Sequence, residues 1–478
     1  MKKKLLVFSS IIVCLLAIVL IVSNFDGSER IIFENNEESK QLMNTNALTM
    51  MYETEVGSGE YQVSSDTTWP QDGYVFNETL SKCENGGTLF WNSETKRVVL
   101  QTNSSDKCYM YFDAYVDPTL ADVCDGKTFA ECITTQVYTG TDGDNGLYYH
   151  DGLGSYTNAD QEAGDNSYRY AGGDYQLTSK STAAGYVAVF KPDYGGLDGV
   201  IIFHCEDGEY GCSLPNAKSY TLAYNETTEY STYQDALETA VSDGYLTKDN
   251  IKNYVCFGSN EETCPIDNLY RVIGVFNNQV KLIKATSYGN YAYDVEDSSM
   301  WDASTKPDIY TTLNETYYNS LGSEWQNLIV ETTWQVGGID FSYATEIPKT
   351  AYDYEVGINQ TGYEEIMKIG LMYVSDYGYA ASPKKWIMRT SSVYYGYDNW
   401  LYLGSYERTI PRVGIGPSGG ETMFHWAVCI DNFEDSGSTS TCRAEESRSI
   451  RPSFYLEYSV QLTGGTGIQS DPFRLSMN

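Results

Sequence analysis

The hydrophobic pattern begins with an uncharged apolar run from Leu5 to Val22, directly after three lysines at positions 2–4. As a helix, its eighteen residues would reach about 27 Å, which is enough to cross the hydrocarbon core of a bilayer. Positive charge before the run places the N-terminus in the cytoplasm and the following chain outside. A cleaved signal peptide is the alternative, although positions 21–23 form a poor small-x-small cleavage site. We expect a cytoplasmic tail at 1–4 and a single-pass signal-anchor at 5–22 that holds a mostly extracellular chain at the cell membrane.

The next part of the chain predicts a stalk and a small β unit. Residues 23–56 carry widely spaced apolar side chains among polar ones, which predicts a stalk with a short helix between positions 31 and 51. Further on, apolar residues alternate with polar ones on both sides of a polar turn at 92–95, which is a hairpin signal. We therefore expect residues 57–118 to form a small all-β unit.

Helices and strands alternate in the rest of the chain. Apolar residues recur about every fourth position at 233–241, where the pattern ends at Gly244, and again at 309–328, which predicts two amphipathic helices. Between them, residues 269–284 form two apolar runs around an Asn-Asn pair, the clearest hairpin signal in the sequence. Residues 119–250 predict a β-rich region. The fold class is therefore α+β and rich in strands.

Composition excludes several classes of protein. The chain has 478 residues, with 31 Lys and Arg against 65 Asp and Glu, so its net charge is −34. Such a chain repels nucleic-acid phosphates, and we expect no nucleic-acid partner. Hydrophobic residues make up 41% and Tyr alone contributes 43 residues, too apolar a composition for a disordered acidic chain.

Ten of the eleven cysteines lie outside the apolar N-terminal run and fall into five neighbouring couples. An even number in an exported chain predicts disulfides, and sequential pairing is the simplest of many connectivities. None of these cysteines has the spacing or the nearby histidines of a zinc site, so we expect no zinc. The couples are Cys83 with Cys108, Cys124 with Cys132, Cys205 with Cys212, Cys256 with Cys264, and Cys429 with Cys442.

The loop at 139–166 is rich in Gly, Asp and Asn and invites a calcium interpretation. It fails the EF-hand pattern, because Gly146 and Leu147 follow Asp142 and Asp144 where a ligand and the glycine are required. Asx-turns in an exposed loop explain the composition better. Calcium at a site of another type stays open as a cofactor.

The stretch 413–420 matches two catalytic patterns, a GxGxxG and a GxSxG around Ser418. Both mechanisms need a helix directly afterwards, whereas the following residues alternate like a strand, so a glycine-rich hairpin loop is favoured. His425 is the only histidine near Ser418, and the whole chain contains three. Triads and histidine-rich metal sites are thus disfavoured, and the many acids cannot be sorted into a glycosidase pair. We expect no enzyme.

The C-terminal half carries an ordered set of segments: LYRVIGVFNNQVKLIKA, MWDASTKPDIYTTLNETYYNSLGSEWQNLI, KIGLMYVSDYGYAA, NWLYLG, WAVCIDNF, IRPSFYLEYSV and GGTGIQSDPFRL. In this order they resemble a domain-of-unknown-function family of surface proteins from Gram-positive gut bacteria. That family is related to the C-type-lectin-like fold, which also carries the formylglycine-generating enzymes. The resemblance implies a C-type-lectin-like domain at 251–478, with 166–173 as its separated first strand and 174–250 as an insertion.

The resemblance implies a fold and no chemistry. The fold is a twisted antiparallel β core flanked by two helices and closed where a C-terminal strand near 453–460 returns beside the first strand. The calcium-binding triplets of sugar-binding C-type lectins are missing from the sequence. The cysteines of this domain have the spacing of local disulfides and not of the copper-binding pair of the formylglycine-generating enzymes, so no catalytic residue is carried over.

Aromatic residues in a loop provide the candidate binding face. Aromatic rings stack on sugars and contact protein partners with little loss of entropy, and loops of this fold class carry recognition. We expect an extracellular protein that binds a glycan or a surface protein through loops at 376–406 and 412–440. The alternatives are an exported enzyme of the formylglycine-generating branch and a structural surface protein without a ligand. The candidate ligand-binding residues are Tyr394, Tyr395, Tyr397, Trp400, Tyr402 and Tyr406.

Overall fold

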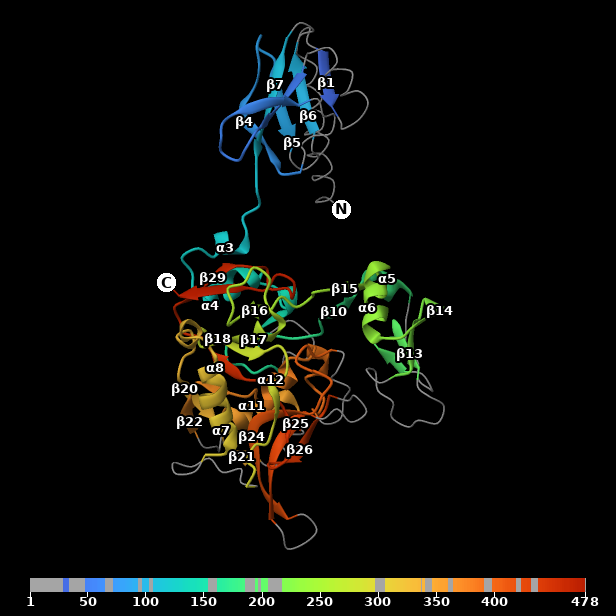
Figure 1. Ribbon diagram of the computed structural model, residues 1–478. Helices are drawn as coiled ribbons and strands as arrows, with labels where there is room; N and C mark the ends of the chain where they lie inside the picture. Colours follow the sequence, from blue (N-terminus) through green and yellow to red (C-terminus); the bar gives the residue numbers. More distant parts are fainter. Residues whose placement is uncertain are drawn as a thin grey trace, which may run out of the picture. The chain divides into compact units, whose positions relative to one another are not determined.

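The computed structural model divides the chain into two units, Met1–Pro118 and Thr119–Asn478. Figure 1 shows their elements coloured along the sequence. The structure describes residues 29–33, 48–64, 72–92, 97–102, 106–153, 161–184, 194–196, 199–204, 217–296, 306–336, 338–339, 346–359, 364–390, 398–417, 423–430 and 437–477.

The described part of the N-terminal unit consists of two sheets. One sheet has the order β3-β2-β7-β4, in which β2 and β7 run parallel. The other has the order β1-β6-β5, and its β5–β6 pair is the hairpin that the sequence predicts. Alternate side chains of β2 and β7 are buried between them, including Met50, Tyr52 and Phe112. The strands are β1 (Glu29–Phe33), β2 (Leu48–Glu53), β3 (Tyr61–Ser64), β4 (Tyr74–Cys83), β5 (Thr88–Asn92), β6 (Arg97–Thr102) and β7 (Cys108–Ala114).

The helix expected between positions 31 and 51 is wrong, because the described residues at both ends of that segment are strands. β2 lies between β3 and β7, so its side chains face the two sides of the sheet in turn. Leu48 and Met50 are buried, whereas Thr49 and Met51 are only partly covered. The apolar residues thus follow a period of two, and the strands of the unit reach into the segment expected as a stalk.

The expected anchor lies outside the residues that the structure describes. Residues 1–28 are not among them. In the described part of the chain, no helix is both long and apolar enough to span a bilayer. The anchor at 5–22 stays a prediction from the sequence.

The largest sheet of the second unit has the order β23-β28-β18-β17-β9-β8, with β16 also paired to β17. β9 pairs antiparallel with β17 through Arg169 and Gly274. The C-terminal strand expected beside the first strand lies elsewhere, because β28 pairs with β18 and β23 and not with β9. The strands are β8 (Leu147–His150), β9 (Ser167–Tyr170), β16 (Tyr254–Cys256), β17 (Leu269–Phe276), β18 (Gln279–Lys284), β23 (Ile369–Gly370) and β28 (Ser453–Tyr455).

The hairpin of β17 and β18 confirms the prediction for residues 269–284. Its turn consists of Asn277 and Asn278, whose φ angles are 48° and 63°. Two successive positive φ angles are typical of the type I′ turn, whose twist matches that of the strands, and Asn tolerates this conformation better than most residues. Phe276 therefore pairs directly with Gln279, which fixes the register of the sheet.

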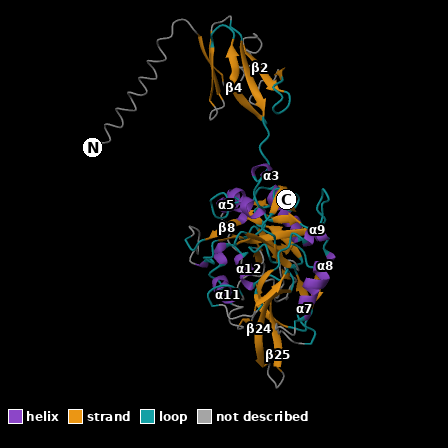
Figure 2. Cartoon of the chain, turned by 90° about the vertical axis from the view of Figure 1, so that its left-hand side faces the viewer, coloured by secondary structure: helices purple, strands orange, loops and turns teal. Residues whose placement is uncertain are grey.

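Helices flank the strands of the second unit on both sides (Figure 2). The helical stripe expected at 309–328 is confirmed in part. Ile309, Leu313 and Tyr317 are buried on a continuous helical stretch, which ends before Gly322, the N-cap of α9. The elements are α3 (Leu120–Val123), α4 (Phe129–Cys132), η1 (Ile133–Val137), η2 (Asp144–Gly146), η5 (Ile266–Asn268), α7 (Asp308–Thr311), η6 (Thr312–Tyr317), α8 (Tyr318–Ser320), α9 (Ser323–Gln326), α11 (Pro348–Glu355), α12 (Val374–Tyr379) and η7 (Pro383–Lys385).

The segment between β9 and β16 has its own core. β10 and β15 pair at its two ends, and α6 covers a sheet of order β11-β12-β13-β14. The helix predicted at 233–241 is α6, which Thr232 caps and after which Gly244 has a φ of 79°. The elements are β10 (Tyr175–Leu177), α5 (Ser179–Ala184), β11 (Tyr194–Gly196), β12 (Ile201–His204), β13 (Ser219–Leu222), β14 (Asn225–Tyr230), α6 (Tyr233–Ser242) and β15 (Leu246–Lys248).

The second sheet of this unit has the order β19-β27-β24-β25-β26, with β21 beside β24. Its long β24–β25 hairpin confirms that a strand follows the glycine-rich stretch at 413–420. Two small sheets pair β20 with β22 and β29 with β30. The strands are β19 (Gly289–Tyr291), β20 (Thr332–Gln335), β21 (Gly338–Ile339), β22 (Glu364–Met367), β24 (Glu407–Pro417), β25 (Met423–Ile430), β26 (Thr439–Arg443), β27 (Arg448–Ile450), β29 (Val460–Gly464) and β30 (Arg474–Met477).

Four of the five predicted disulfides are confirmed. They join Cys83 to Cys108, Cys124 to Cys132, Cys256 to Cys264, and Cys429 to Cys442. The fifth couple, Cys205 and Cys212, lies outside the described residues. Each observed bond closes a short loop between neighbouring elements, so the disulfides link local structure and leave the packing of the sheets to side chains.

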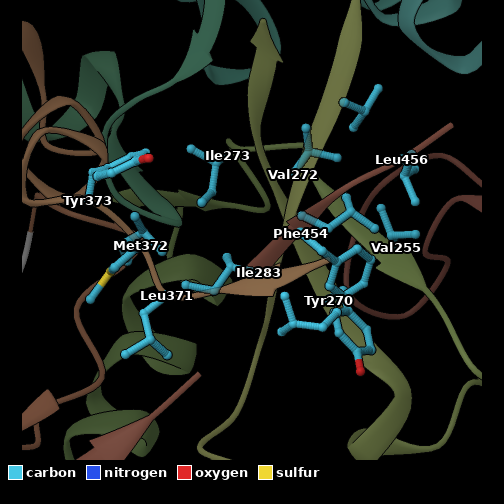
Figure 3. Packing of buried hydrophobic residues seen from close by; sticks show 14 of the residues in the cluster. Val255, Tyr270, Val272, Ile273, Ile283, Leu371, Met372, Tyr373, Phe454 and Leu456 are labelled. Atoms are coloured by element: carbon cyan, nitrogen blue, oxygen red, sulfur yellow. The ribbon is translucent and has the colours of Figure 1, made fainter. Parts of the chain in front are cut away.

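The main core lies on the large sheet. Figure 3 shows Tyr270 of β17 packed against Phe454 of β28, and their ring centroids are 5.6 Å apart. Trp334 is fully buried and fits closely against β23, because a Cβ atom on Gly370 would lie 2.6 Å from its ring carbons. A glycine is therefore required at this point of the sheet.

We predict that Gly370→Ala destabilises the second unit. The added methyl group overlaps the Trp334 ring, so the free energy of unfolding should fall by about 1–3 kcal/mol. Gly464→Ala is the control, since its Cβ would meet Arg474 atoms at an ordinary 3.8 Å and should change the stability by less than about 0.5 kcal/mol. Chemical denaturation measures both variants, and an equal loss in the two would contradict the close packing of Gly370 against Trp334.

Candidate functional site

A cavity of about 300 Å³ opens where β9, the β17–β18 turn, α11, α12 and β28 meet. We call it the Arg169 cavity. Charged side chains and aromatic rings line it together. The lining residues used below are Asp165, Arg169, Phe276, Tyr352, Asp376 and Tyr455.

Arg169 lies at the centre of these side chains. Its residue is only 3% exposed, and its guanidinium donates to Asp165 Oδ2 at 2.7 Å and to Ser167 Oγ at 2.8 Å. Its carbon atom Cζ lies 4.6 Å from the Phe276 ring centroid and 5.3 Å from that of Tyr352. The NH1 nitrogen forms no hydrogen bond with the described residues. This cation therefore has donors to spare beside the cavity.

Lys281 and Asp376 form a second charged pair behind the cavity. Lys281 Nζ lies 2.6 Å from Asp376 Oδ2, and the two side chains are 0% and 3% exposed. The same carboxylate accepts from the backbone N–H of Tyr373 at 2.9 Å, and its Oδ1 lies 4.0 Å from Arg169 NH1. Burial lowers the pKa of Lys281, although Asp376 opposes that shift. Asp376 thus connects β9, β18 and α12 through one carboxylate.

Glu355 holds α11 against α12. It ends α11, is buried, and accepts from the backbone N–H groups of Val374 and Ser375 at 2.8 and 2.9 Å. Burial and, to a smaller extent, the neighbouring Asp376 raise its pKa to about 7, against the opposing effect of the hydrogen bonds from Ser375 and Val374. With a pKa in this range, the carboxyl group changes its charge near neutral pH.

The pKa of Asp165 is shifted in the opposite direction. Burial alone would raise its pKa, but the Arg169 guanidinium and the Ser167 hydroxyl outweigh that effect and hold the pKa well below its usual range. The two carboxyl groups that flank α11 therefore differ in charge near pH 7. Asp165 is an anion that pairs with Arg169, whereas Glu355 is partly protonated.

The aromatic loop expected as the binding face is only partly described. Tyr394, Tyr395 and Tyr397 lie outside the described residues. Tyr402 is partly buried against the main core, and the Tyr406 ring lies 4.8 Å from the Arg448 guanidinium carbon. These two rings are therefore partly engaged within the protein.

Trp400 needs a correction. It is 4% exposed, donates from Nε1 to the carbonyl of Tyr170 at 2.8 Å, and packs beneath the Arg271 guanidinium at 4.6 Å. A buried ring with a satisfied N–H cannot stack on a sugar. Arg271 in turn pairs with Asp174, so Trp400 belongs to a structural contact between the core and the segment that follows β9.

The other candidate residues have local structural partners. Asp142 accepts from the backbone N–H of Tyr149, and Asp144 accepts from the Thr139 hydroxyl. Asp151 accepts from the backbone N–H of Leu153, two residues on, which is the Asx-turn contact that the sequence favours. His150 is buried and accepts on Nδ1 from the N–H of Ala163, and burial holds its pKa well below its usual value. Ser418 lies outside the described residues, so its distance from His425 is not defined.

One cluster among the described residues has the composition of a metal site, Cys83, Asp106 and Cys108. Its two sulfur atoms are bonded to each other in a disulfide, and Asp106 accepts from the backbone N–H groups of Asn85 and Gly87. The sulfur atoms that could bind a metal are thus held in the disulfide, and the carboxylate oxygens of Asp106 bind the turn that links β4 to β5.

Comparison with known proteins finds no family model, no curated protein and no solved structure that matches this chain. The family resemblance drawn from the sequence stays an expectation. The candidate residues expected from the sequence do not include Arg169, Lys281, Glu355 or Asp376. Two of them lie inside the quoted segments LYRVIGVFNNQVKLIKA and KIGLMYVSDYGYAA, where a charged residue stands within an apolar run and signals a buried polar contact.

We predict that the titration of Glu355 makes the protein less stable as the pH rises. Because the folded pKa of about 7 exceeds the unfolded value of 4.5, the folded state binds more protons between these values, and stability is lost as the pH rises through them. The contribution is on the order of 2–3 kcal/mol at full effect. Chemical denaturation at about pH 5 and about pH 8 should show this loss as the difference between the native chain and Glu355→Gln, because buried His150 and the other titrating groups contribute equally to both.

Glu226→Gln serves as the matched control. Glu226 is an exposed residue of β14, far from the Arg169 cavity in sequence and element. Its replacement should leave the difference between the two pH values unchanged. If Glu355→Gln kept the full difference as well, another group would be responsible.

Proposed function

We propose that this chain is an extracellular binding protein, anchored in the membrane through residues 5–22, and that the Arg169 cavity binds a sugar residue of a glycan. The observation that carries the proposal is a buried arginine with unused donors, set among aromatic rings and a carboxylate at one cavity. The proposed site is therefore a cavity of the second unit instead of the aromatic loop at 394–406.

The chemistry of the lining suits a sugar. A sugar offers hydroxyl groups that both donate and accept hydrogen bonds, and apolar C–H faces that pack on aromatic rings. Arg169 supplies donors, Asp165 supplies acceptor oxygens, and Phe276, Tyr352 and Tyr455 supply rings. The volume of about 300 Å³ lies at the small end of ligand cavities, which favours one sugar ring over a folded protein surface.

The charges around the cavity favour a neutral ligand. Arg169 and Lys281 face Asp165 and Asp376, so two cations are balanced by two carboxylates. A strongly charged ligand would leave one of these pairs unbalanced in a poorly solvated site. A neutral hexose unit at the end of a surface glycan is the ligand class that fits best, and a protein ligand is the second candidate.

We predict that Tyr352→Ala weakens glycan binding by about tenfold or more, because it removes a ring from the cavity wall. Binding is measured on a glycan array with the purified full chain and then by titration with the bound glycan. Tyr354→Ala is the control on the same helix, since Tyr354 does not line the cavity. A glycan that binds both variants like the native chain would contradict this site, and the absence of any binding would favour a structural surface protein.

We predict that glycan binding is independent of calcium. The donors and acceptors assigned to the sugar are side chains that pair with one another and need no metal. The array signal should be the same in calcium and in EDTA. Loss of the signal in EDTA would contradict recognition by the Arg169 cavity alone and would point to a metal held by the acidic loops.

A further inference from the structure

The amine of Lys281 and the carboxyl group of Asp376 are in direct contact in the protein interior, as the two groups of a condensation reaction must be. The amine of Lys281 on β18 and the carboxyl group of Asp376 on α12 lie 2.6 Å apart, and solvent is excluded from both. Four rings surround the Nζ atom, with centroids at 4.3 Å for Tyr373, 5.0 Å for Trp334, 5.3 Å for Tyr455 and 5.9 Å for Phe276. Removing water favours neutral groups over an ion pair and disfavours the reverse hydrolysis.

We propose that Lys281 and Asp376 form an intramolecular amide crosslink between Nζ and Cγ. The inference goes beyond ligand binding, because it concerns a covalent modification of the chain by its own residues. An ordinary buried ion pair is the alternative, and the two differ in mass.

The reaction is a condensation that needs no other reactant. The ammonium group of Lys281 first gives a proton to Asp376 Oδ2, which it already contacts, leaving a neutral amine and a carboxylic acid. The amine lone pair then attacks Cγ, and a C–N bond forms. A second proton moves from nitrogen to Oδ2, the C–O bond breaks, and one water molecule leaves. An ammonium and a carboxylate thus become an amide and water, with atoms and charge balanced.

The surrounding groups have the roles that such a reaction requires. Negative charge grows on Oδ1 as the amine attacks, and Arg169 NH1, which lies 4.0 Å from that oxygen, has unused donors to stabilise it. Buried Glu355 binds the backbone N–H groups of the two residues before Asp376. These two hydrogen bonds hold the start of α12, and with it Asp376, in place beside Lys281.

The crosslink would join β18 to α12 across 95 residues of sequence. A bond that closes so long a segment restricts the unfolded chain more than the short loops closed by the four disulfides. Unlike a disulfide, an amide survives reducing agents. Reduced protein should therefore resist unfolding and proteolysis through this bond.

The test is the mass of the purified full chain after reduction and alkylation. A crosslinked chain weighs one water molecule less than its sequence. After digestion with trypsin, the peptide with Lys281 stays joined to the peptide with Asp376, and no cleavage follows Lys281. Two separate peptides of full mass would overturn the proposal.

Two variants distinguish the crosslink from other losses of water. Lys281→Arg keeps the positive charge but lacks the nucleophilic amine, so it should have the full mass. Lys284→Arg is the matched control on the same strand, and because Lys284 Nζ contacts the backbone carbonyl of Asp267 and not a carboxylate, the crosslink should form as in the native chain. A missing water in Lys281→Arg would overturn the proposal.

Glu355→Gln tests the positioning of Asp376. The amide nitrogen of Gln cannot accept a backbone N–H, so one of the two hydrogen bonds from Val374 and Ser375 is lost, and the chain should lose water more slowly than the native chain. Crosslinking at the native rate would overturn the positioning role of Glu355.

Discussion

The second unit depends on the way it neutralises charge in a space that water does not reach. Asp376 accepts from buried Lys281 and faces buried Arg169, and each of these cations also packs against aromatic rings. Removing the partner of any one of these charges would leave an unpaired ion in the interior. Burying an unpaired ion costs far more free energy than burying the intact pair. The network therefore fixes β9, β18 and α12 relative to one another, and with them the walls of the Arg169 cavity.

Tyrosine supplies much of the surrounding interior. Tyr170, Tyr270, Tyr293, Tyr377 and Tyr379 are among the largest fully buried side chains. The ring of a buried tyrosine adds hydrophobic stabilisation, while its hydroxyl favours a hydrogen-bond partner. Tyr293, for example, donates to the carbonyl of Ile410 at 3.0 Å. Many tyrosines of this sequence therefore serve core packing. Trp400, which lies in the tyrosine-rich stretch expected as a binding face, is buried in the same way.

The Arg169 cavity and the charged network share residues, because Arg169 and Asp376 belong to both. Arg169 faces the cavity with its free donors and is held in place by Asp165 and Ser167. Glu355 fixes the start of α12, from which Asp376 and Tyr373 project. A site whose polar groups are already oriented by the fold loses little entropy when a ligand binds. The proposed crosslink would make the same walls more rigid, while the amide oxygen of Asp376 would still accept hydrogen bonds.

The sequence by itself determined the features that depend on neighbouring residues. Repeats of two and four residues predicted the hairpin at 269–284 and helix α6, and close spacing predicted the disulfides. The same reasoning failed at Leu48 and Met51, because only the flanking strands β3 and β7 make that segment a strand. Arg169, Lys281, Glu355 and Asp376 come from separate parts of the chain, and no local pattern links them. Only the tertiary structure placed them together, since the removal of water that gives these charges their properties exists only after the sheets and helices have packed.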